Sequence, residues 1–336
     1  MRRRGPDARG IKITERAILF HTRLIVVDPE NGAQPMTQKE NGLEYTIVYN
    51  GELYNTEELR KELTAAGIEF FGHSDTEVVL KSYIHWGEKC LDRFNGIFAF
   101  AVWEEATQRL FFARDRMGVK PFFYALKNDT FIFGSEIKTL LEYPDIEPVI
   151  DRKGIIDLLF IGPGRTPGCG VFRDIHELEP GHCGTFDRNG LRTFSYWKLK
   201  DRLHTETFEE TSDHVRYLVT DAIRRQLVSD VPLGTFLSGG LDSSIISAVA
   251  ASHFRSLGHQ LDTFSVTYTD NQKYFKTSKF QPTTDEPYIQ MMAEFLGSNH
   301  HTFVVDNEQL ALALKAAVDA RDLPGMADVD SSLLLF

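Results

Sequence analysis

Hydrophobic and polar positions along the chain follow two different rhythms. Up to about residue 190, short hydrophobic runs of strand length recur, separated by Gly, Asn, Asp and Pro. Strands are predicted over residues 18–27, 45–49, 96–104, 109–114, 122–126 and 130–134. Two helical patterns interrupt these runs. Blocks of strands with helices on one side predict stacked sheets covered by helices, an α+β layered fold.

The two helical patterns carry the same start signal. One begins at Asn55 and the other at Ser74, and each has a glutamate three residues on, Glu58 and Glu77. This is the spacing of a capping box, in which the two side chains cap each other's backbone N–H groups. Hydrophobic residues then recur on one face: Leu59, Leu63 and Ala66 in the first helix, and Val78, Val79, Tyr83 and Ile84 in the second.

From about residue 211 helices and strands alternate. Helices are predicted over residues 211–228, 242–254, 286–296 and 308–320, and strands over 235–237, 261–268 and 301–305. This alternation predicts a doubly wound parallel sheet, which binds ligands at the carboxyl ends of its strands. We therefore divide the chain into a first domain at 1–190, a connector at 191–210 and a second domain at 211–336.

Composition narrows the class of protein. The net charge of −11 over 336 residues argues against a nucleic-acid partner. No apolar run reaches membrane-spanning length, and no apolar segment follows Arg2-Arg3-Arg4, so neither a membrane anchor nor an export signal is predicted. The three cysteines form no CxxC pair, which fits a reducing compartment. We expect a cytoplasmic protein.

One glycine-rich turn, Ser238-Gly239-Gly240-Leu241-Asp242-Ser243-Ser244, lies between a predicted strand and a predicted helix. Glycines permit positive φ and close backbone approach, and a helix N-terminus directs N–H groups at an anion. The turn lacks the lysine of G-x-x-x-x-G-K-[ST] and the spacing of G-x-G-x-x-G. It is therefore a candidate phosphate loop of another kind, and the alternative is a Ser/Gly-rich turn without a ligand.

This turn resembles the pyrophosphate loop of the ATP pyrophosphatases. The resemblance implies that ATP binds with Mg²⁺, and it makes Asp242 a candidate partner of the metal ion. Leu237 and Val266 would contact adenine through their backbones, although Val266 alone could also be a plain core residue. Asp328 and Asp330 are candidates for the nucleotide or aspartate site. The residues implied in ATP binding are Leu237, Ser238, Gly239, Gly240, Asp242, Ser243, Ser244 and Val266.

Five short motifs stand out in the first half: Arg4–Asp7, His21–Leu24 with Asp28 and Gln34-Pro35, Asn50–Asn55, Ser74–Glu77 and Arg114–Pro121. Each alone has a purely structural interpretation. Asn50-Gly51 is typical of a tight hairpin turn. Asp75 could favour a helix N-terminus, and Arg23 could form a surface ion pair.

Together and in this order the motifs resemble the class II glutamine amidotransferase domain, which has an N-terminal-nucleophile fold. With the downstream loop, the whole chain resembles glutamine-hydrolysing asparagine synthetase. The implied fold is an αββα sandwich followed by a truncated α/β doubly wound ATP-pyrophosphatase domain. By resemblance, Arg23 binds the glutamine carboxylate, Asp75 binds its ammonium group, and Glu52 contacts the same amino group. The Asn50 side chain and the Gly51 N–H form the oxyanion hole.

The resemblance implies a two-part reaction. Glutamine would be hydrolysed to glutamate and ammonia, and ATP would activate aspartate as an aspartyl-adenylate with release of pyrophosphate. Ammonia would then give asparagine and AMP. The implied partners are glutamine, aspartate and ATP, and a homodimer is compatible with the resemblance. Two alternatives stay open: a related amide-forming ligase with another acceptor, and a non-catalytic protein that binds glutamine or a nucleotide.

The chain departs from the family pattern at its nucleophile. The family's catalytic cysteine lies a short distance upstream of the Arg4–Asp7 motif, and this sequence starts at Met1. The three cysteines, Cys90, Cys169 and Cys183, have no general base at a suitable spacing. A zinc site from Cys169, His176, His182 and Cys183 matches no usual ligand pattern. We therefore expect a fragment of a longer synthetase, without glutaminase activity and with little synthetase activity of its own.

Overall fold

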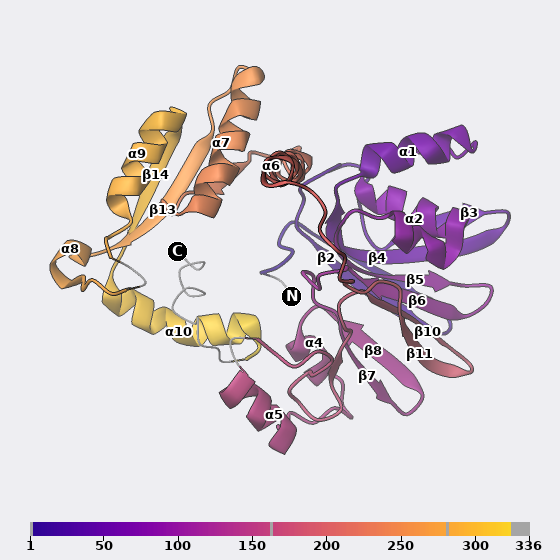
Figure 1. Cartoon of the computed structure of the whole chain (residues 1–336). Helices are drawn as coiled ribbons and strands as arrows, with labels where there is room; N and C mark the ends of the chain where they lie inside the picture. The colour runs from indigo at the N-terminus through magenta and orange to yellow at the C-terminus, as the bar shows by residue number, and fades with distance from the viewer. Residues whose placement is uncertain (1–2, 162–163, 280–281, 324–336) are drawn as a thin grey trace. The chain divides into compact units, whose positions relative to one another are not determined.

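The computed structural model describes residues 3–161, 164–279 and 282–323. The chain forms two compact units, Met1–Asp201 and Arg202–Phe336 (Figure 1). The first unit's large sheet extends to Ser195, inside the range 191–210 that the sequence analysis assigns to a connector. Within the described ranges, no helix is both long enough and apolar enough to cross a lipid bilayer.

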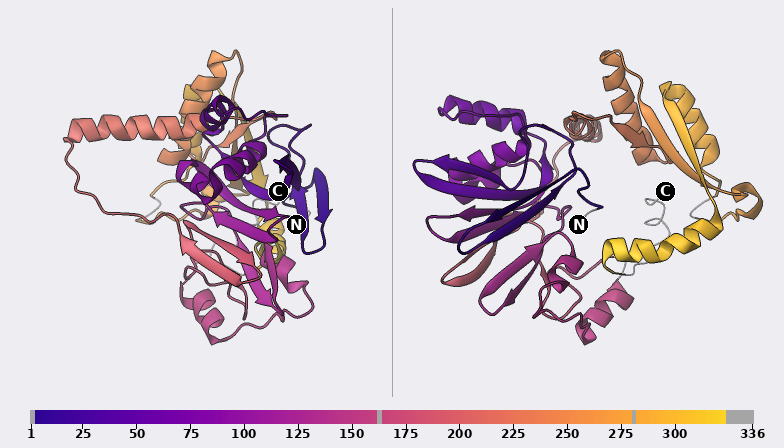
Figure 2. Two further views of the ribbon diagram at one scale, coloured as in Figure 1. Left: turned by 90° about the vertical axis from the view of Figure 1, so that its right-hand side faces the viewer. Right: turned by 180° about the vertical axis from the view of Figure 1, so that it is seen from behind.

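The first unit is a four-layer αββα sandwich, which confirms the predicted fold class (Figures 1 and 2). Helices α1 (Thr56–Ala65) and α2 (Asp75–Trp86) form the outer layer on one side, and α2 contacts strands β3 and β4. The central sheet has the order β11-β10-β6-β5-β4-β3, and a smaller sheet has the order β8-β7-β9. Helix α4 (Ile137–Leu141) contacts β7 and β8 from the far side.

The remaining elements of this unit complete the two sheets and their connections. Strands β1 (Ala8–Ile13) and β2 (Ile18–Arg23) form a separate antiparallel ribbon. The other strands are β3 (Met36–Glu40), β4 (Leu43–Leu53), β5 (Gly96–Glu104), β6 (Arg109–Arg114), β7 (Phe123–Lys127), β8 (Thr130–Gly134), β9 (His176–Glu177), β10 (His182–Asp187) and β11 (Gly190–Ser195). The short helical elements are η1 (Gly87–Lys89), α3 (Cys90–Arg93), α5 (Arg152–Ile156) and η2 (Asp157–Ile161).

Alternation along the central strands creates two cores, one on each face of the large sheet. Ile47 and Tyr49 of β4 point to the helical layer and pack with Val78 and Leu63. Val48, between them in sequence, packs on the opposite face with the residues between the two sheets. This period of two places neighbouring β4 residues on different faces of the sheet. It therefore determines which candidate site residues of β4 can contact one another.

The six predicted strands and two predicted helices of this unit are present, although the first strand ends at Arg23 rather than at residue 27, and the missed strands have a common cause. Five strands escaped the pattern: β1, β3, β9, β10 and β11. Their sequences are polar or contain glycine, for example MTQKE in β3 and HCGTFD in β10. β3 and β11 are edge strands, so pairing to one neighbour rather than hydrophobic patterning defines them.

The two helix starts differ in detail from the predicted capping boxes. Ser74 caps α2, and its side chain accepts a hydrogen bond from the Glu77 N–H. Glu77 turns instead to the Phe71 and Gly72 amides, so the reciprocal half of the box is not formed. At α1, Asn55 makes no side-chain cap and instead bridges to the backbone of Arg93 and Asn95. Asn55 therefore has tertiary partners instead of a local cap, whereas Glu77 binds the loop just before its helix.

The second unit contains a parallel sheet with the order β12-β13-β14. Helix α7 contacts β12, and α9 contacts both α7 and β13. The elements are α6 (Phe208–Arg225), β12 (Gly234–Phe236), α7 (Leu241–Ser256), β13 (Asp262–Tyr268), α8 (Asn271–Tyr274), α9 (Glu286–Leu296), β14 (Asn299–Val305) and α10 (Asn307–Arg321). The predicted β-α alternation and the parallel pairing are confirmed.

Candidate functional site

The glycine-rich turn connects β12 to the N-terminus of α7, in the strand-to-helix position predicted from the sequence. The hydroxyls of Ser238 and Ser243 lie 3.0 Å apart, and the Ser243 hydroxyl also accepts a bond from the Ser238 N–H at 3.2 Å. The Ser244 hydroxyl donates to the Gly240 carbonyl at 2.7 Å. The hydroxyls thus brace one another around the first turn of α7, whose free N–H groups suit an anion.

Gly239 shows why the turn needs glycine. Its φ of +77° is in the left-handed region, and a Cβ built there would lie 2.9 Å from Tyr288 Cβ and 3.1 Å from the Asp285 carbonyl oxygen. The turn therefore packs directly against the start of α9, and a side chain would push it away. Gly240, by contrast, has only the Ser238 hydroxyl within 4 Å of such a Cβ.

Three other predicted nucleotide residues lie at the same edge of the sheet. Leu237 is fully buried and donates its N–H to the Phe264 carbonyl at 2.8 Å. Val266 lies on β13 two residues beyond Phe264, and so nearer the carboxyl end. Asp242 is exposed in the first turn of α7, where a carboxylate can reach a cation held by bound phosphates.

Glu286, the first residue of α9, makes contacts with two other elements. One of its carboxylate oxygens accepts hydrogen bonds from the Thr267 hydroxyl at 2.8 Å and from the Asn271 side-chain amide at 2.7 Å. Its other oxygen is buried, with no hydrogen-bond partner among the described residues. The bond from Asn271, with smaller contributions from Thr284 and Thr267, lowers the pKa of Glu286 to about 2. Glu286 therefore ties α9 to the end of β13 and to α8.

This low pKa predicts an acid-sensitive link. A carboxylate with a depressed pKa contributes stability that is present above its ordinary value of 4.5 and is lost as the pH falls through about 2. We expect NMR titration of the Glu286 carboxyl carbon to show a midpoint near pH 2. In Asn271→Ala the midpoint should move up towards the ordinary value. An ordinary midpoint in the unmodified chain would contradict the assigned link.

Arg23, the predicted carboxylate ligand, is buried at the end of β2, so its interpretation as a surface ion pair is wrong. Its guanidinium donates to the carbonyls of Val27 at 2.8 Å, Asp28 at 2.7 Å and Pro29 at 3.3 Å. A Cβ on Gly32 would overlap Arg23 Nη2 at 2.0 Å, so the loop closes tightly on the side chain. The carbonyls fix the guanidinium in one orientation.

Asp75 is the first residue of α2 and points to the end of β4. Its carboxylate accepts hydrogen bonds from the Tyr49 hydroxyl at 2.9 Å and from the Leu53 N–H at 3.1 Å. Burial raises the pKa of Asp75, while these two donors act in the opposite direction. The charges of Arg23 and Asp75 are close enough to interact. A cation and an anion in one buried neighbourhood suit the two ends of an α-amino acid.

Asn50 and Gly51 lie inside β4, paired with Ala99 and Phe98 of β5, so their interpretation as a hairpin turn is wrong. Gly51 is required by close packing, because a Cβ there would lie 2.5 Å from the Ile97 carbonyl oxygen. The Asn50 side-chain amide donates to the Ser135 hydroxyl at 3.3 Å. Ser135 was not predicted, because an isolated serine 85 residues away in sequence carries no local signal.

Glu52, two positions beyond Asn50 on β4, shares its face of the strand. Its charge lies close enough to Asp75 to contribute to that residue's raised pKa, after the larger effect of burial. The structure therefore brings together Arg23, Asp75 and Glu52 by electrostatic proximity, and places Asn50 and Gly51 on the same strand as Glu52.

Asp28, in the His21–Leu24 and Gln34-Pro35 motif group, supports this neighbourhood. Its Oδ2 accepts from the His73 N–H at 2.7 Å and from the Ser74 N–H at 3.1 Å, next to Asp75. Burial opposes ionisation of Asp28, but the amides of Asn31 and His73 more than offset it, so its pKa is lowered. Asp28 thereby anchors the loop around Arg23 to the start of α2.

The three cysteines are all buried. Burial raises the pKa of the Cys90 thiol, and it raises the pKa of Cys183 to about 12. Neither thiol is an available nucleophile, because the thiolate is the reactive form. Within the described ranges, no three or more His, Cys, Asp or Glu side chains are arranged to hold a metal ion. His300 contacts Thr263 and His301 contacts Asp262, so these two neighbouring histidines of β14 face opposite ways. Asp328 and Asp330 lie outside the described residues.

The fold defines a class of protein: an αββα sandwich joined to a parallel-sheet unit that has a glycine-rich turn between a strand and a helix. The chain belongs to the glutamine amidotransferase family, since the family model described as "Glutamine amidotransferase domain" matches residues 1–197. The family model described as "Asparagine synthase" matches residues 214–336.

Three curated proteins are similar to this chain. It is 53% identical over 335 residues to glutamine-hydrolyzing asparagine synthetase 3 of Bacillus subtilis (strain 168), covering 99% of this chain and 55% of that protein. It is 37% identical over 265 residues to asparagine synthetase 1 of the same organism, covering 78% and 40%. It is 33% identical over 330 residues to amidase chyE of Penicillium rubens, covering 96% and 48%. The chain thus spans about half the length of these relatives.

Proposed function

We propose that this chain carries the glutamine site and the ATP site of a glutamine-hydrolysing asparagine synthetase. The overall reaction is the ATP-dependent amidation of aspartate, with ammonia derived from glutamine. The observation that carries the proposal is the 53% identity across both units with a protein of that name. The cluster of Arg23, Asp75 and Glu52 and the turn Ser238–Ser244 occur on one chain, and this combination supports the proposal.

In the first unit, the residues bind and orient glutamine. Arg23 takes the substrate carboxylate, and Asp75 with Glu52 takes its ammonium group. The amide of Asn50 and the N–H of Gly51 are donors for the oxygen on which negative charge develops during hydrolysis. Ser135 accepts one N–H of Asn50 and leaves the second for that oxygen. None of the three cysteines supplies the attacking thiolate, so these residues account for binding and charge stabilisation only.

In the second unit, the turn Ser238–Ser244 holds the phosphates of ATP. The N-terminal amides of α7 donate to the phosphate oxygens, and the serine hydroxyls do so once they turn away from one another and from the Gly240 carbonyl. Mg²⁺, when bound, neutralises charge on the departing pyrophosphate. Asp242 fits this ion, since Mg²⁺ is usually held by one or two carboxylates together with phosphate oxygens. Adenylation gives the aspartate carboxyl a leaving group that ammonia can displace.

Charge removal at Asp75 tests the glutamine site. Asp75→Asn keeps an acceptor for the Tyr49 hydroxyl and the Leu53 amide but loses the negative charge. We expect the Kd for L-glutamine, measured by calorimetry, to rise at least about tenfold, equivalent to about 1.4 kcal/mol. Asp187→Asn, at the last residue of β10, is the matched control and should leave the Kd unchanged. If both variants bind L-glutamine with equal affinity, Asp75 is not part of the glutamine site.

Product analysis tests the whole proposal. The chain is incubated with aspartate, ATP, Mg²⁺ and ammonium, which bypasses the need for a thiol nucleophile. Formation of AMP, pyrophosphate and asparagine supports the proposal. Because the chain spans about half the length of its relatives, binding of glutamine and ATP without turnover is compatible with the proposed sites, whereas binding of neither ligand would contradict them. AMP formation only with another carboxylic acid would favour a related ligase.

A further inference from the structure

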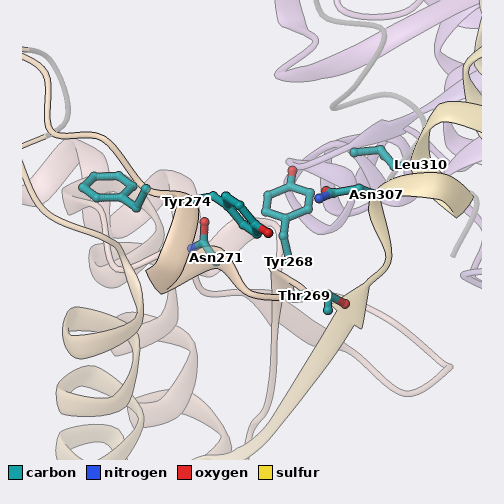
Figure 3. Close-up of a pocket in the computed structure, with 7 residues that line it drawn as sticks. Tyr268, Thr269, Asn271, Tyr274, Asn307 and Leu310 are labelled. Carbon is teal, nitrogen blue, oxygen red and sulfur yellow. The ribbon is translucent and has the colours of Figure 1, made fainter.

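A hollow of about 290 Å³ in the second unit is lined by residues of β13, α8 and α10 (Figure 3). Tyr268 in its wall follows Val266 by two residues on β13, at the carboxyl edge of the sheet. The hollow therefore adjoins the candidate ATP residues and defines no separate site. A different feature, in the first unit, concerns the strand that carries Asn50 and Gly51.

Strand β4 has an open edge at the residues proposed to bind glutamine. Its neighbour β3 pairs with it only up to Ile47, whereas β5 on the other side pairs with it as far as Leu53. Beyond Ile47, alternate backbone groups of β4 therefore face no described strand. The Gly51 N–H is one of them, because Phe98, its partner on β5, bonds through both its N–H and its carbonyl to Asp115.

Tyr49, two positions before Gly51, faces the same open edge, but both of its backbone groups have partners. The Gln34 side-chain oxygen accepts from the Tyr49 N–H at 2.7 Å. The Tyr49 carbonyl lies 3.1 Å from His21 Nε2, and because a carbonyl only accepts, Nε2 carries the proton. The other ring nitrogen, Nδ1, is buried without a hydrogen-bond partner among the described residues. Two side chains thus take the hydrogen-bonding positions that a neighbouring strand would use.

The same two side chains connect the elements that carry the candidate glutamine site. His21 lies on β2, two residues before Arg23, and β2 contacts β4. Gln34 also donates through its Nε2 to the Thr76 hydroxyl at 3.2 Å, next to Asp75 on α2. These bonds therefore set the spacing between the groups assigned to the two ends of glutamine and the donors on β4.

We propose that His21 and Gln34 are positioning residues for glutamine: by binding the backbone of Tyr49, they hold β4 so that the Gly51 N–H stays unpaired and directed at the substrate's amide oxygen. The inference rests on the proposed function, which assigns Gly51 to that oxygen. Both residues act through β4 rather than through contact with the substrate. Loss of either bond leaves a backbone group of Tyr49 without its partner, and β4 must shift to find another.

Calorimetry on the full chain with two amino acids tests the inference. L-Norvaline has the same α-amino acid head as L-glutamine, but a methyl group replaces the carboxamide. We expect His21→Leu and Gln34→Leu each to raise the Kd for L-glutamine at least about threefold, and to leave the Kd for L-norvaline unchanged. His21→Gln keeps an N–H donor in place of Nε2 and should restore most of the L-glutamine affinity. Gln38→Leu, on β3 opposite Tyr45, is the matched control and should change neither Kd.

The NMR signal of the Gly51 amide gives a second readout, which a loss of overall stability does not imitate. In the unmodified chain, this unpaired amide should exchange with solvent faster than the Tyr49 amide. Its resonance should shift when L-glutamine is added and stay in place with L-norvaline. In His21→Leu and Gln34→Leu, the shift caused by L-glutamine should be reduced.

The outcomes separate this inference from the proposed function. Equal L-glutamine affinity in His21→Leu, Gln34→Leu and Gln38→Leu would overturn the inference and leave the proposed glutamine site intact. A parallel loss of L-norvaline binding in the first two variants would assign both residues to general stability and would also overturn it. If the unmodified chain binds neither amino acid at millimolar concentration, the proposed glutamine site fails, and the positioning role fails with it.

Discussion

Asp115→Ala is expected to lower the free energy of unfolding of the first unit by about 3–5 kcal/mol. Asp115 is buried in the loop after β6, and its carboxylate accepts four backbone N–H bonds. Oδ1 accepts from Met117 and Val119, both at 3.0 Å. Oδ2 accepts from Lys120 at 3.0 Å and from Phe98, which lies on β5, at 3.2 Å. Alanine removes all four acceptors at once.

The measurement is urea unfolding followed by tryptophan fluorescence. All three tryptophans, Trp86, Trp103 and Trp197, lie in the first unit, so the signal reports that unit alone. Asp187→Ala removes a carboxylate that accepts a single exposed N–H, from Asn189, and should change stability by less than about 1 kcal/mol. The free energy of unfolding of Asp115→Asn should lie between those of Asp115→Ala and Asp187→Ala. If Asp115→Ala and Asp187→Ala have the same free energy of unfolding, the four hydrogen bonds that Asp115 accepts do not stabilise the first unit.

Gly239→Ala is expected to weaken binding of ATP and Mg²⁺ at least about tenfold. The substitution combines left-handed strain, about 1–2 kcal/mol, with a Cβ only 2.9 Å from Tyr288 Cβ. The neighbours are the backbone and Cβ of α9 rather than the end of a flexible side chain, so the loop must move. Movement separates the Ser238 and Ser243 hydroxyls from the amides of α7, and calorimetry detects the loss.

A second glycine variant separates the effect of backbone strain from the effect of the steric clash with α9. Gly258 has a φ of +78°, but a Cβ there would meet no atom within 4 Å. Gly258→Ala therefore carries the same backbone strain without displacing the loop, and its ATP affinity should match the unmodified chain. Circular dichroism should show helical content retained in both variants. Equal affinity in the two alanine variants would show that the packing of Gly239 against α9 is irrelevant to binding.

The candidate glutamine site shows what sequence reasoning could reach. Its motifs are contiguous and keep a fixed order, so Arg23, Asn50, Glu52 and Asp75 were named without coordinates. The contacts that orient them come from residues far away in sequence. Ser135 meets Asn50 across 85 positions, and Asp28 reaches the amides beside Asp75 across more than 40. No local pattern records such pairs, because they form only when the layers stack.

The sequence by itself determined the two rhythms of elements, an α+β layered class for the first unit, a parallel-sheet class for the second, and the strand-to-helix position of the candidate phosphate loop. These follow from hydrophobic period and glycine placement, which are local properties. Tertiary structure alone decided that Asn50-Gly51 is strand rather than turn, because nine-residue pairing of β4 with β5 outweighs a two-residue turn preference. It also decided that Glu286 accepts a hydrogen bond from Asn271 and so ties α9 to α8. Both outcomes depend on partners supplied by other elements, which the order of residues does not reveal.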